Sequence, residues 1–212
     1  VDQSAPPLLP VPREAPLPLS FAQQRLWFID QLEPGSPLYN IPAALRVEGP
    51  LDAEVLALTL GEIECRHEAL RTVFVVQDDA PVQVIRPAVP FVLPLVDLAG
   101  VRDHAGFLVQ EEAHRPFDLT RGPLLRAVLL RFAPEDHIVA LTMHHIVSDG
   151  WSMSILVREI GILYAAFAEG RPSPLAELPV QYADFAAWQH SWLHGEILES
   201  ETSFWRQQLW GL

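Results

Sequence analysis

The chain of 212 residues contains no lysine: all 14 of its basic residues are arginine, against 27 aspartates and glutamates. The formal net charge of −13 leaves no basic surface to neutralise phosphate groups, so the composition excludes a nucleic-acid-binding protein. The absence of lysine also excludes lysine-based nucleophilic chemistry such as Schiff-base formation.

Cysteine is almost as scarce, because Cys65 is the only one. A single cysteine forms no internal disulfide, and its position in a helical pattern predicts a small buried side chain and not a nucleophile. No apolar stretch approaches the roughly 20 residues that span a bilayer. Residues 1–18 also lack the basic start and apolar core of an export signal. We therefore expect a cytoplasmic protein without membrane contacts.

Apolar residues make up half of the chain and charged residues 19%, which is typical of a packed globular protein. Residues 1–17 are rich in proline and predict a linker between domains. Helical and strand patterns then follow one another without a regular βαβ rhythm, which predicts an α+β sandwich. We expect residues 18–180 to form one lobe and residues 181–212 an aromatic-rich helical segment.

Local signals predict the main elements. Ser20 and Gln23 form a capping box, which predicts a helix from there to about Leu32. Helical periodicity, strand alternation and turn residues predict further helices over residues 51–70, 102–114 and 152–167, a strand over 44–47, and hairpins over 72–85 and 124–144.

The sharpest chemical signal lies at residues 143–151, MHHIVSDGW, where His144 and His145 end a strongly apolar strand. Neighbouring residues of a strand point to opposite faces, so one histidine faces the core and the other faces a cavity or solvent. Histidine, with an ordinary pKa of about 6.5, suits proton transfer near neutral pH. The strand end therefore carries a candidate acid–base group.

Two other interpretations compete on the loop alone. Both histidines could be structural, or they could bind a metal together with Asp149. Adjacent histidines on a strand diverge, and the sequence has no further Cys/His cluster at zinc spacing, which disfavours a metal site. The remaining histidines have no converging partners; we expect His67 to form structural hydrogen bonds and expect a surface position for His104, His114, His137, His190 and His194.

Four segments resemble the motifs of condensation domains of nonribosomal peptide synthetases, in the order of that family. PLSFAQQRLW (18–27) resembles the opening motif, RHEALRTVF (66–74) the second, MHHIVSDGWS (143–152) the HHxxxDG active-site signature, and YADFAAWQ (182–189) the fourth. The resemblance implies a fold similar to chloramphenicol acetyltransferase, with a mixed sheet and packed helices in two layers. This chain would be the N-terminal lobe, with the C-terminal lobe absent.

The activity that this resemblance implies is amide synthesis. Upstream and downstream peptidyl carrier domains, with an adjacent adenylation domain, would present a donor thioester and an acceptor amine on phosphopantetheine arms. The lobe itself would bind no cofactor and no metal. The opening motif resembles that of domains that accept L-configured donors.

The same resemblance assigns the site residues. His145 would be catalytic, either as a base or by positioning the amine, while His144 and Asp149 would be structural. An arginine of the second motif, Arg66 or Arg71, would hold Asp149. The tunnel for the pantetheine arm would be lined by Ser148, Gly150 and Trp151.

Two alternatives remain: a non-catalytic module that docks a carrier domain or a tailoring enzyme, and a stand-alone acetyltransferase that uses acyl-CoA. The intact signature disfavours the first, and the opening, second and fourth motifs disfavour the second. Without a second lobe we expect the isolated chain to be inactive. We also expect it to self-associate through the tail aromatics Phe185, Trp188, Trp192, Phe204, Trp205 and Trp210.

Overall fold

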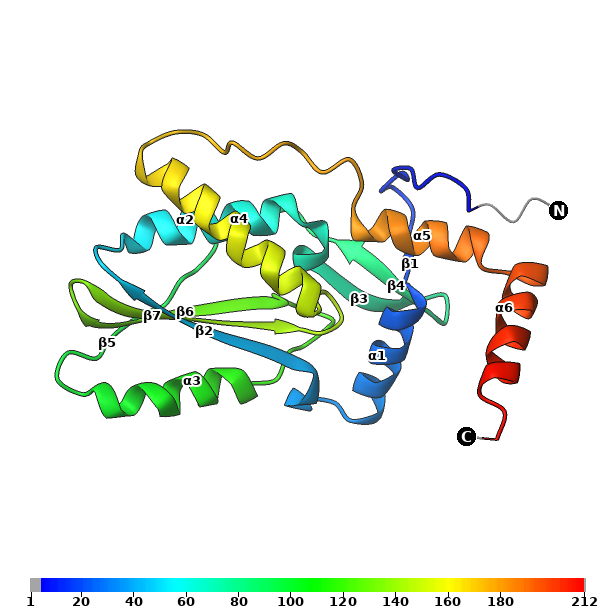
Figure 1. The fold of residues 1–212 in the computed structure, drawn as a ribbon, viewed down its shortest axis with the longest axis horizontal. Helices are drawn as coiled ribbons and strands as arrows, with labels where there is room; N and C mark the ends of the chain where they lie inside the picture. Colours follow the sequence, from blue (N-terminus) through cyan, green and yellow to red (C-terminus); the bar gives the residue numbers. More distant parts are fainter. Residues whose placement is uncertain (1–4, 212) are drawn as a thin grey trace.

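A computed structural model describes residues 5–211, in which helices cover both faces of a four-stranded sheet and a three-stranded sheet lies beside it (Figure 1). The elements follow one another as β1 (Leu17–Pro18), α1 (Phe21–Leu32), η1 (Pro37–Tyr39), β2 (Asn40–Glu48), α2 (Ala53–Arg66), η2 (Glu68–Arg71), β3 (Thr72–Gln77), β4 (Ala80–Ile85), β5 (Leu95–Asp97), η3 (Arg102–His104), α3 (Ala105–His114), β6 (Leu125–Ala133), β7 (Asp136–His144), α4 (Gly150–Ala168), α5 (Tyr182–Trp192) and α6 (Gly195–Gln208). The predicted α+β class and its mixed sheet are confirmed.

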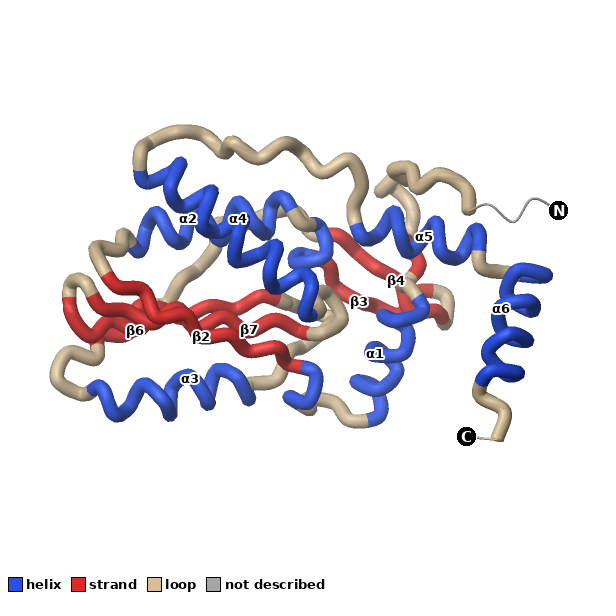
Figure 2. The backbone as a smooth tube through the Cα atoms, viewed as in Figure 1, coloured by secondary structure: helices blue, strands red, loops and turns tan. Residues whose placement is uncertain are grey.

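The four-stranded sheet has the order β2-β7-β6-β5, with β2, β7 and β6 antiparallel and β5 parallel to β6. Side chains alternate across it: Leu129 and Leu141 pack with α2 and α4, whereas Leu130 and Ile138 pack on the side of α3. Figure 2 shows α2 and α4 above the red strands and α3 below them. The central strand β7 is therefore buried on both faces from Val139 to His144.

The two predicted hairpins are confirmed. In β3–β4, Asp78 and Asp79 form the turn with φ of 50° and 60°. Positive φ at both central residues is what a two-residue turn between right-twisted strands needs, and Asp tolerates it better than most residues. In β6–β7, residues 134–135 connect strands that pair from Ala133↔Asp136 to Leu125↔Met143.

The predicted capping box at the start of α1 is also confirmed. The backbone N–H of Gln23 donates to Ser20 Oγ, and the N–H of Ser20 donates to Gln23 Oε1 at 2.9 Å. Another expected helix is shorter than predicted: α2 ends at Arg66, and residues 68–71 form a 3-10 turn. The side chain of Gln181 bonds both the Arg66 carbonyl and the Glu68 N–H at this break, which ends the helix.

The proline-rich start of the chain is attached to the body of the protein. Leu17 and Pro18 form β1, which pairs with β4. Further upstream, the indole N–H of Trp188 donates to the Pro6 carbonyl at 2.7 Å, and Arg13 forms an ion pair with Asp184. The extended conformation that proline favours thus lets residues 6–18 run along α5 and the edge of β4.

The prediction that Cys65 is buried is wrong, because its side chain is exposed. The core-facing side of α2 is formed by Leu60, Ile63 and Glu64 instead. The helical pattern around Cys65 is present, but the helix presents that position to solvent.

The surface positions predicted for two histidines are also wrong. His137 is only 2% exposed; it lies on the central strand β7, with Val47 of β2 as its pairing partner. His190 is half-buried, and its Nε2 lies 2.7 Å from the Leu19 carbonyl. His67 contacts Glu159 at 2.7 Å, as expected of a structural histidine.

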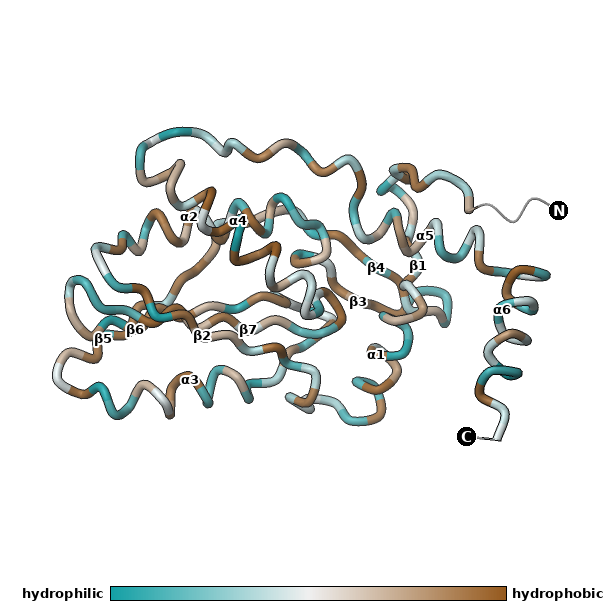
Figure 3. Tube along the Cα trace, viewed as in Figure 1, coloured by the Kyte–Doolittle hydropathy of each residue, from teal (hydrophilic) through white to brown (hydrophobic). Residues whose placement is uncertain are grey.

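Helix α4 meets the length and composition criteria of a membrane span, which the apolar runs of the sequence did not indicate. A buried helix of a globular core meets the same criteria. Here α4 contributes Leu156 and Leu163 to the core shared with α2 and the sheet. Figure 3 shows the corresponding hydrophobic stretches on α4 and the neighbouring strands.

The aromatic tail divides into two groups. Phe185, Trp188 and Trp192 stack along α5, with ring centroids 5.8 and 5.0 Å apart in turn. The aromatics of α6 and its end are open to solvent: Phe204 is 52% exposed and Trp210 89%. Self-association through this surface stays a prediction.

Glu64 is an unusual member of the core face of α2. It is 7% exposed and has no hydrogen bond or ion-pair partner within residues 5–211. Burial raises the pKa of its carboxyl from 4.5 to about 7. A raised carboxyl pKa means that the folded state holds the proton more tightly than the unfolded chain, so this group's contribution to stability is lost as pH rises from 4.5 through 7.

We predict that Glu64→Gln stabilises the protein at pH 8 but not at pH 4.5, because glutamine keeps the shape without an ionisable carboxyl. The difference in free energy of unfolding between the two pH values should shrink by up to about 3 kcal/mol. Urea unfolding of both proteins measures it. The matched control is Glu62→Gln on the same helix, and an equal effect of that variant would contradict the assignment.

Candidate active site

The two histidines lie on opposite sides at the end of β7, as strand alternation predicts. His144, its last residue, is 3% exposed, whereas the side chain of His145 is exposed. The loop then leads to Asp149, and α4 begins at Gly150. The strand thus delivers one imidazole to the core and the next to the surface.

His144 is held inside by specific contacts. Its Nδ1 accepts the backbone N–H of Ile146 at 3.1 Å, and its ring meets the edge of Phe117 with centroids 5.9 Å apart. Burial, and secondarily the neighbouring His145, lower its pKa from 6.5 to about 4. Since Nδ1 accepts a hydrogen bond, the neutral ring carries its proton on Nε2. These contacts suit a structural role.

His145 is fixed through its backbone and open through its side chain. Its N–H donates to the Tyr39 carbonyl at 2.8 Å, which extends the β2–β7 ladder by one pair. No protein group among residues 5–211 forms a hydrogen bond with the imidazole itself. The ring is therefore a free donor and acceptor on a rigid strand end.

Gln23 connects this loop to α1. Its amide nitrogen lies 3.4 Å from the Ile146 carbonyl and 3.3 Å from Gln83 Oε1, while its amide oxygen accepts from Ser20 N–H. The sequence predicted the cap but not the contact with the loop. The residue type carried a signal for this contact. A capping box accepts either Glu or Gln, but only Gln also has an amide N–H, and in a residue that is 1% exposed that donor needs a partner inside the protein.

Asp149 is the N-cap of α4. Its Oδ1 accepts from the backbone N–H of Ser152 at 2.8 Å and from Ser152 Oγ at 2.6 Å. These bonds, with a smaller contribution from nearby His145, hold the pKa of the Asp149 carboxyl below its usual value. The carboxylate therefore stabilises the start of α4 directly after the loop.

The prediction that Arg66 or Arg71 holds Asp149 is wrong. Arg66 Nε pairs with Glu159 Oε2 at 3.3 Å, and Arg71 pairs with Glu68 and donates to a backbone carbonyl at the end of β4. Glu159 lies ten residues beyond Asp149, about 15 Å along the helix. The arginines of the second motif thus brace the middle of α4 and the end of β4, and Asp149 is satisfied by its own helix.

The three residues expected to line a pantetheine tunnel have different environments. Trp151 is 79% exposed, and nothing lies within 4 Å of a Cβ built on Gly150. Ser148 is 7% exposed, and its hydroxyl has no partner within the described residues. Gly150 and Trp151 therefore face solvent beside His145, whereas Ser148 points inward. Their role in a tunnel stays a prediction.

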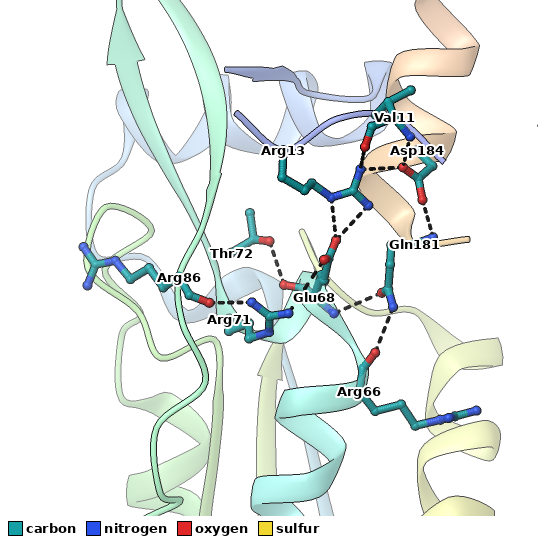
Figure 4. Close-up of polar contacts among 9 residues, drawn as sticks. All are labelled: Val11, Arg13, Arg66, Glu68, Arg71, Thr72, Arg86, Gln181 and Asp184. Carbon is teal, nitrogen blue, oxygen red and sulfur yellow. Dashed lines mark hydrogen bonds and ion pairs between the residues drawn. The ribbon is translucent and has the colours of Figure 1, made fainter. Parts of the chain in front are cut away.

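The second and fourth motifs meet in one polar network (Figure 4). Arg13 pairs with Glu68 of the second motif at 2.9 Å and with Asp184 of the fourth at 2.6 Å. Asp184, 1% exposed, also accepts the N–H groups of Val11 and Gln181. These motif residues hold α5, η2 and the N-terminal segment together and do not contact His145.

Metal ligands and clefts do not gather at the loop. In the described part of the chain no three His, Cys, Asp or Glu side chains lie close enough to hold a metal ion. His145 does not line either of two clefts, of about 1080 and 550 Å³, found elsewhere on the described chain. The site consists of an exposed histidine on a loop whose backbone is held by Tyr39, directly before β2.

We predict that Asp149→Ala lowers the free energy of unfolding by about 1 kcal/mol, the usual cost of losing an N-cap. Asp149→Asn should retain most of the stability, because its amide oxygen still accepts from Ser152. Thermal or urea unfolding of both variants measures this. A loss of several kcal/mol in both variants would indicate a lost ion pair instead.

Acid should destabilise the protein through His144. Because its folded pKa lies below the unfolded value of 6.5, the unfolded chain binds the extra proton, and stability falls as pH drops from 6.5 towards 4. We expect up to about 3 kcal/mol from this group. The free energy of unfolding, measured by urea denaturation across this pH range, should depend less on pH in His144→Asn than in the unaltered chain. The control His104→Asn, at an exposed site, should show the same pH dependence as the unaltered chain.

The sequence of this chain matches a known protein family. A family model described as "Condensation domain" matches residues 13–212. One of the proteins that make up the linear gramicidin synthase of Brevibacillus parabrevis is 47% identical over 99% of this chain. The chain spans only 3% of that relative's length.

Solved structures agree with this match. The X-domain in its complex with OxyB from teicoplanin biosynthesis superposes with a TM-score of 0.90 at 30% identity, covering 99% of this chain and 46% of that one. The first condensation domain of the calcium-dependent antibiotic synthetase, in complex with a substrate analogue, gives 0.81 at 25% identity, covering 92% and 48%. The chain is a member of the condensation-domain family of nonribosomal peptide synthetases.

Proposed function

We propose that the loop around His145 catalyses amide formation between a donor thioester and an acceptor amine. One observation carries the proposal: a solvent-open imidazole at the end of a rigid strand, beside a buried histidine whose lowered pKa keeps it neutral. These two environments support the roles that the resemblance assigns, a catalytic role for His145 and a structural role for His144.

The proposed reaction is the attack of an amine on a thioester. The amine nitrogen attacks the thioester carbonyl carbon, the C–N bond forms, and the C–S bond breaks to release a thiol. The nitrogen loses one proton, and the leaving sulfur gains one. His145 either takes the first proton or holds the amine in line by a hydrogen bond. A base would make the rate depend on the protonation of His145, whereas a positioning group would act mainly on the KM of the acceptor.

The substrates would arrive on partner domains. We propose that upstream and downstream peptidyl carrier domains present them on phosphopantetheine arms, with an adenylation domain beside them in a cytoplasmic synthetase. The relative from linear gramicidin synthase supports a multidomain setting, since this chain matches only a small part of it. We keep the L-configured donor as a proposal that rests on the opening motif at residues 18–27.

The 212 residues alone should not turn over. The imidazole of His145 is exposed and lines neither cleft described above, so the expectation rests on the absence of a second wall to hold two thioester arms in register. Positioning contributes more to such a reaction than proton transfer. An assay of this chain with both loaded carriers tests the point: amide formation at the rate of the parent synthetase would overturn it.

A second candidate is an interaction module. The superposition with an X-domain, solved as a complex with OxyB, supports a fold that recruits another protein. The intact pair His144–His145 favours catalysis over this alternative.

A stand-alone acyl-CoA acetyltransferase is a third candidate, and turnover of acetyl-CoA by this chain would identify it.

We predict that His145→Ala in the full-length parent lowers the rate of amide formation by about 100-fold or more. Its melting temperature should stay unchanged, because the side chain is exposed and has no protein partner in the described chain. Single-turnover assays with loaded carriers measure the rate. His104→Ala, at another exposed histidine, is the matched control, and full activity of a folded His145→Ala protein would exclude the catalytic role.

A further inference from the structure

The larger cleft, about 1080 Å³, lies beside β6, on the side of the sheet away from β2. Its walls are the end of α2, the segment 86–94 that leads from β4 to β5, one side of α3, and the edge of β6. Its apolar lining includes Val89, Phe91, Val92, Pro94, Leu108 and Leu130. This volume slightly exceeds the roughly 300–1,000 Å³ of typical ligand pockets, so it suits something larger than one amino acid.

One stretch of β6 is a free strand edge inside this cleft. His144 N–H donates to the Leu124 carbonyl, so even-numbered residues of β6 direct their backbone groups to β7. Odd-numbered residues direct theirs to the other side, as the bond from Leu129 N–H to the Pro94 carbonyl shows. The N–H and C=O of Ala127, which is 6% exposed and lines the cleft, therefore point into it.

No strand of the described chain pairs with Ala127 on that side. Strand β5 begins at Leu95, opposite Leu129, and the preceding segment turns away to pack Phe91 against Gly61 of α2. Two of that segment's residues, Pro87 and Pro90, have no N–H to offer a neighbouring strand. The edge of β6 is thus left open at Ala127.

Two side chains of the same cleft offer groups that no other residue among 5–211 engages. Arg71 lines the cleft with a buried Nε that donates to nothing, which is uncommon and costly. Glu64, a residue 7% exposed, lines it with a carboxyl that forms no hydrogen bond or ion pair. One donor, one carboxyl and one peptide group therefore face the same apolar space.

We propose that this cleft binds a short apolar peptide in extended conformation, with its backbone paired to Ala127 and its ammonium group against Glu64. An extended peptide supplies the N–H and C=O that a strand edge lacks, and its side chains fill apolar walls. A peptide carbonyl can accept from Arg71 Nε. The site is separate from the amide-forming loop, because His145 does not line the cleft.

A phosphate or other compact anion fits less well, although arginines surround the cleft. Arg126 is already engaged by Glu112 and by the Phe117 ring. Arg86 donates to the carbonyls of Thr120 and Arg121. The free groups thus suit a ligand that both donates and accepts hydrogen bonds.

The test uses the synthetic tetrapeptide Val-Leu-Val-Leu, with a free amino terminus and an amidated carboxyl terminus, titrated calorimetrically into this chain. We expect saturable one-to-one binding. N-acetylation of the peptide and Glu64→Gln should each weaken it by about tenfold, and the two together little more than either alone, because both remove the same contact. Methylation of the central amide nitrogens should weaken binding by at least as much, since it blocks pairing with Ala127.

Two controls make the result specific. Glu62→Gln, on the same helix but outside the cleft, should leave the affinity unchanged, and so should His145→Ala. The proposal is overturned if the free-amine peptide does not bind, if acetylated and free peptides bind equally well, or if His145→Ala abolishes binding. None of these outcomes depends on amide formation, so the proposed activity is judged separately.

Discussion

The position of the loop depends on the pairing of β7 with strands on both sides. From Asn40↔His144 to Glu48↔Asp136 it pairs with β2, and from Leu125↔Met143 onwards with β6. A shift of one residue in this register would exchange the two faces and place His145 in the core and His144 outside. The apolar side chains of β7 between two helical layers make such a shift costly, and so the order of the two histidines is fixed by packing.

The motif segments other than the signature act mostly as a frame for the loop. Arg66 and His67 both contact Glu159 in the middle of α4, the helix that starts immediately after the loop. Glu68 is joined through Arg13 to Asp184 of α5. The contacts that keep the strand and helix on either side of the loop in place therefore come from segments far apart in the chain.

Elements governed by local chemistry could be predicted from the sequence: the capping box of α1, the Asp78–Asp79 turn and the apolar pair β6–β7. The opposite orientation of His144 and His145 followed from strand geometry alone. Contacts across the fold could not be predicted. Asp149 was expected to need an arginine, but its own helix start satisfies it, and neither the exposure of Cys65 nor the burial of His137 follows from the residues beside them in the sequence.

The amide of Gln23 has a consequence for which side chains this position tolerates. It must offer an acceptor to Ser20 N–H and a donor to the Ile146 carbonyl at the same time. A carboxylate of the same length would turn a second lone pair towards that carbonyl, and an aliphatic chain would leave both groups unsatisfied. The first turn of α1 and the turn after His145 are therefore joined through one side chain, so a substitution at position 23 would disturb the helix cap and the loop together.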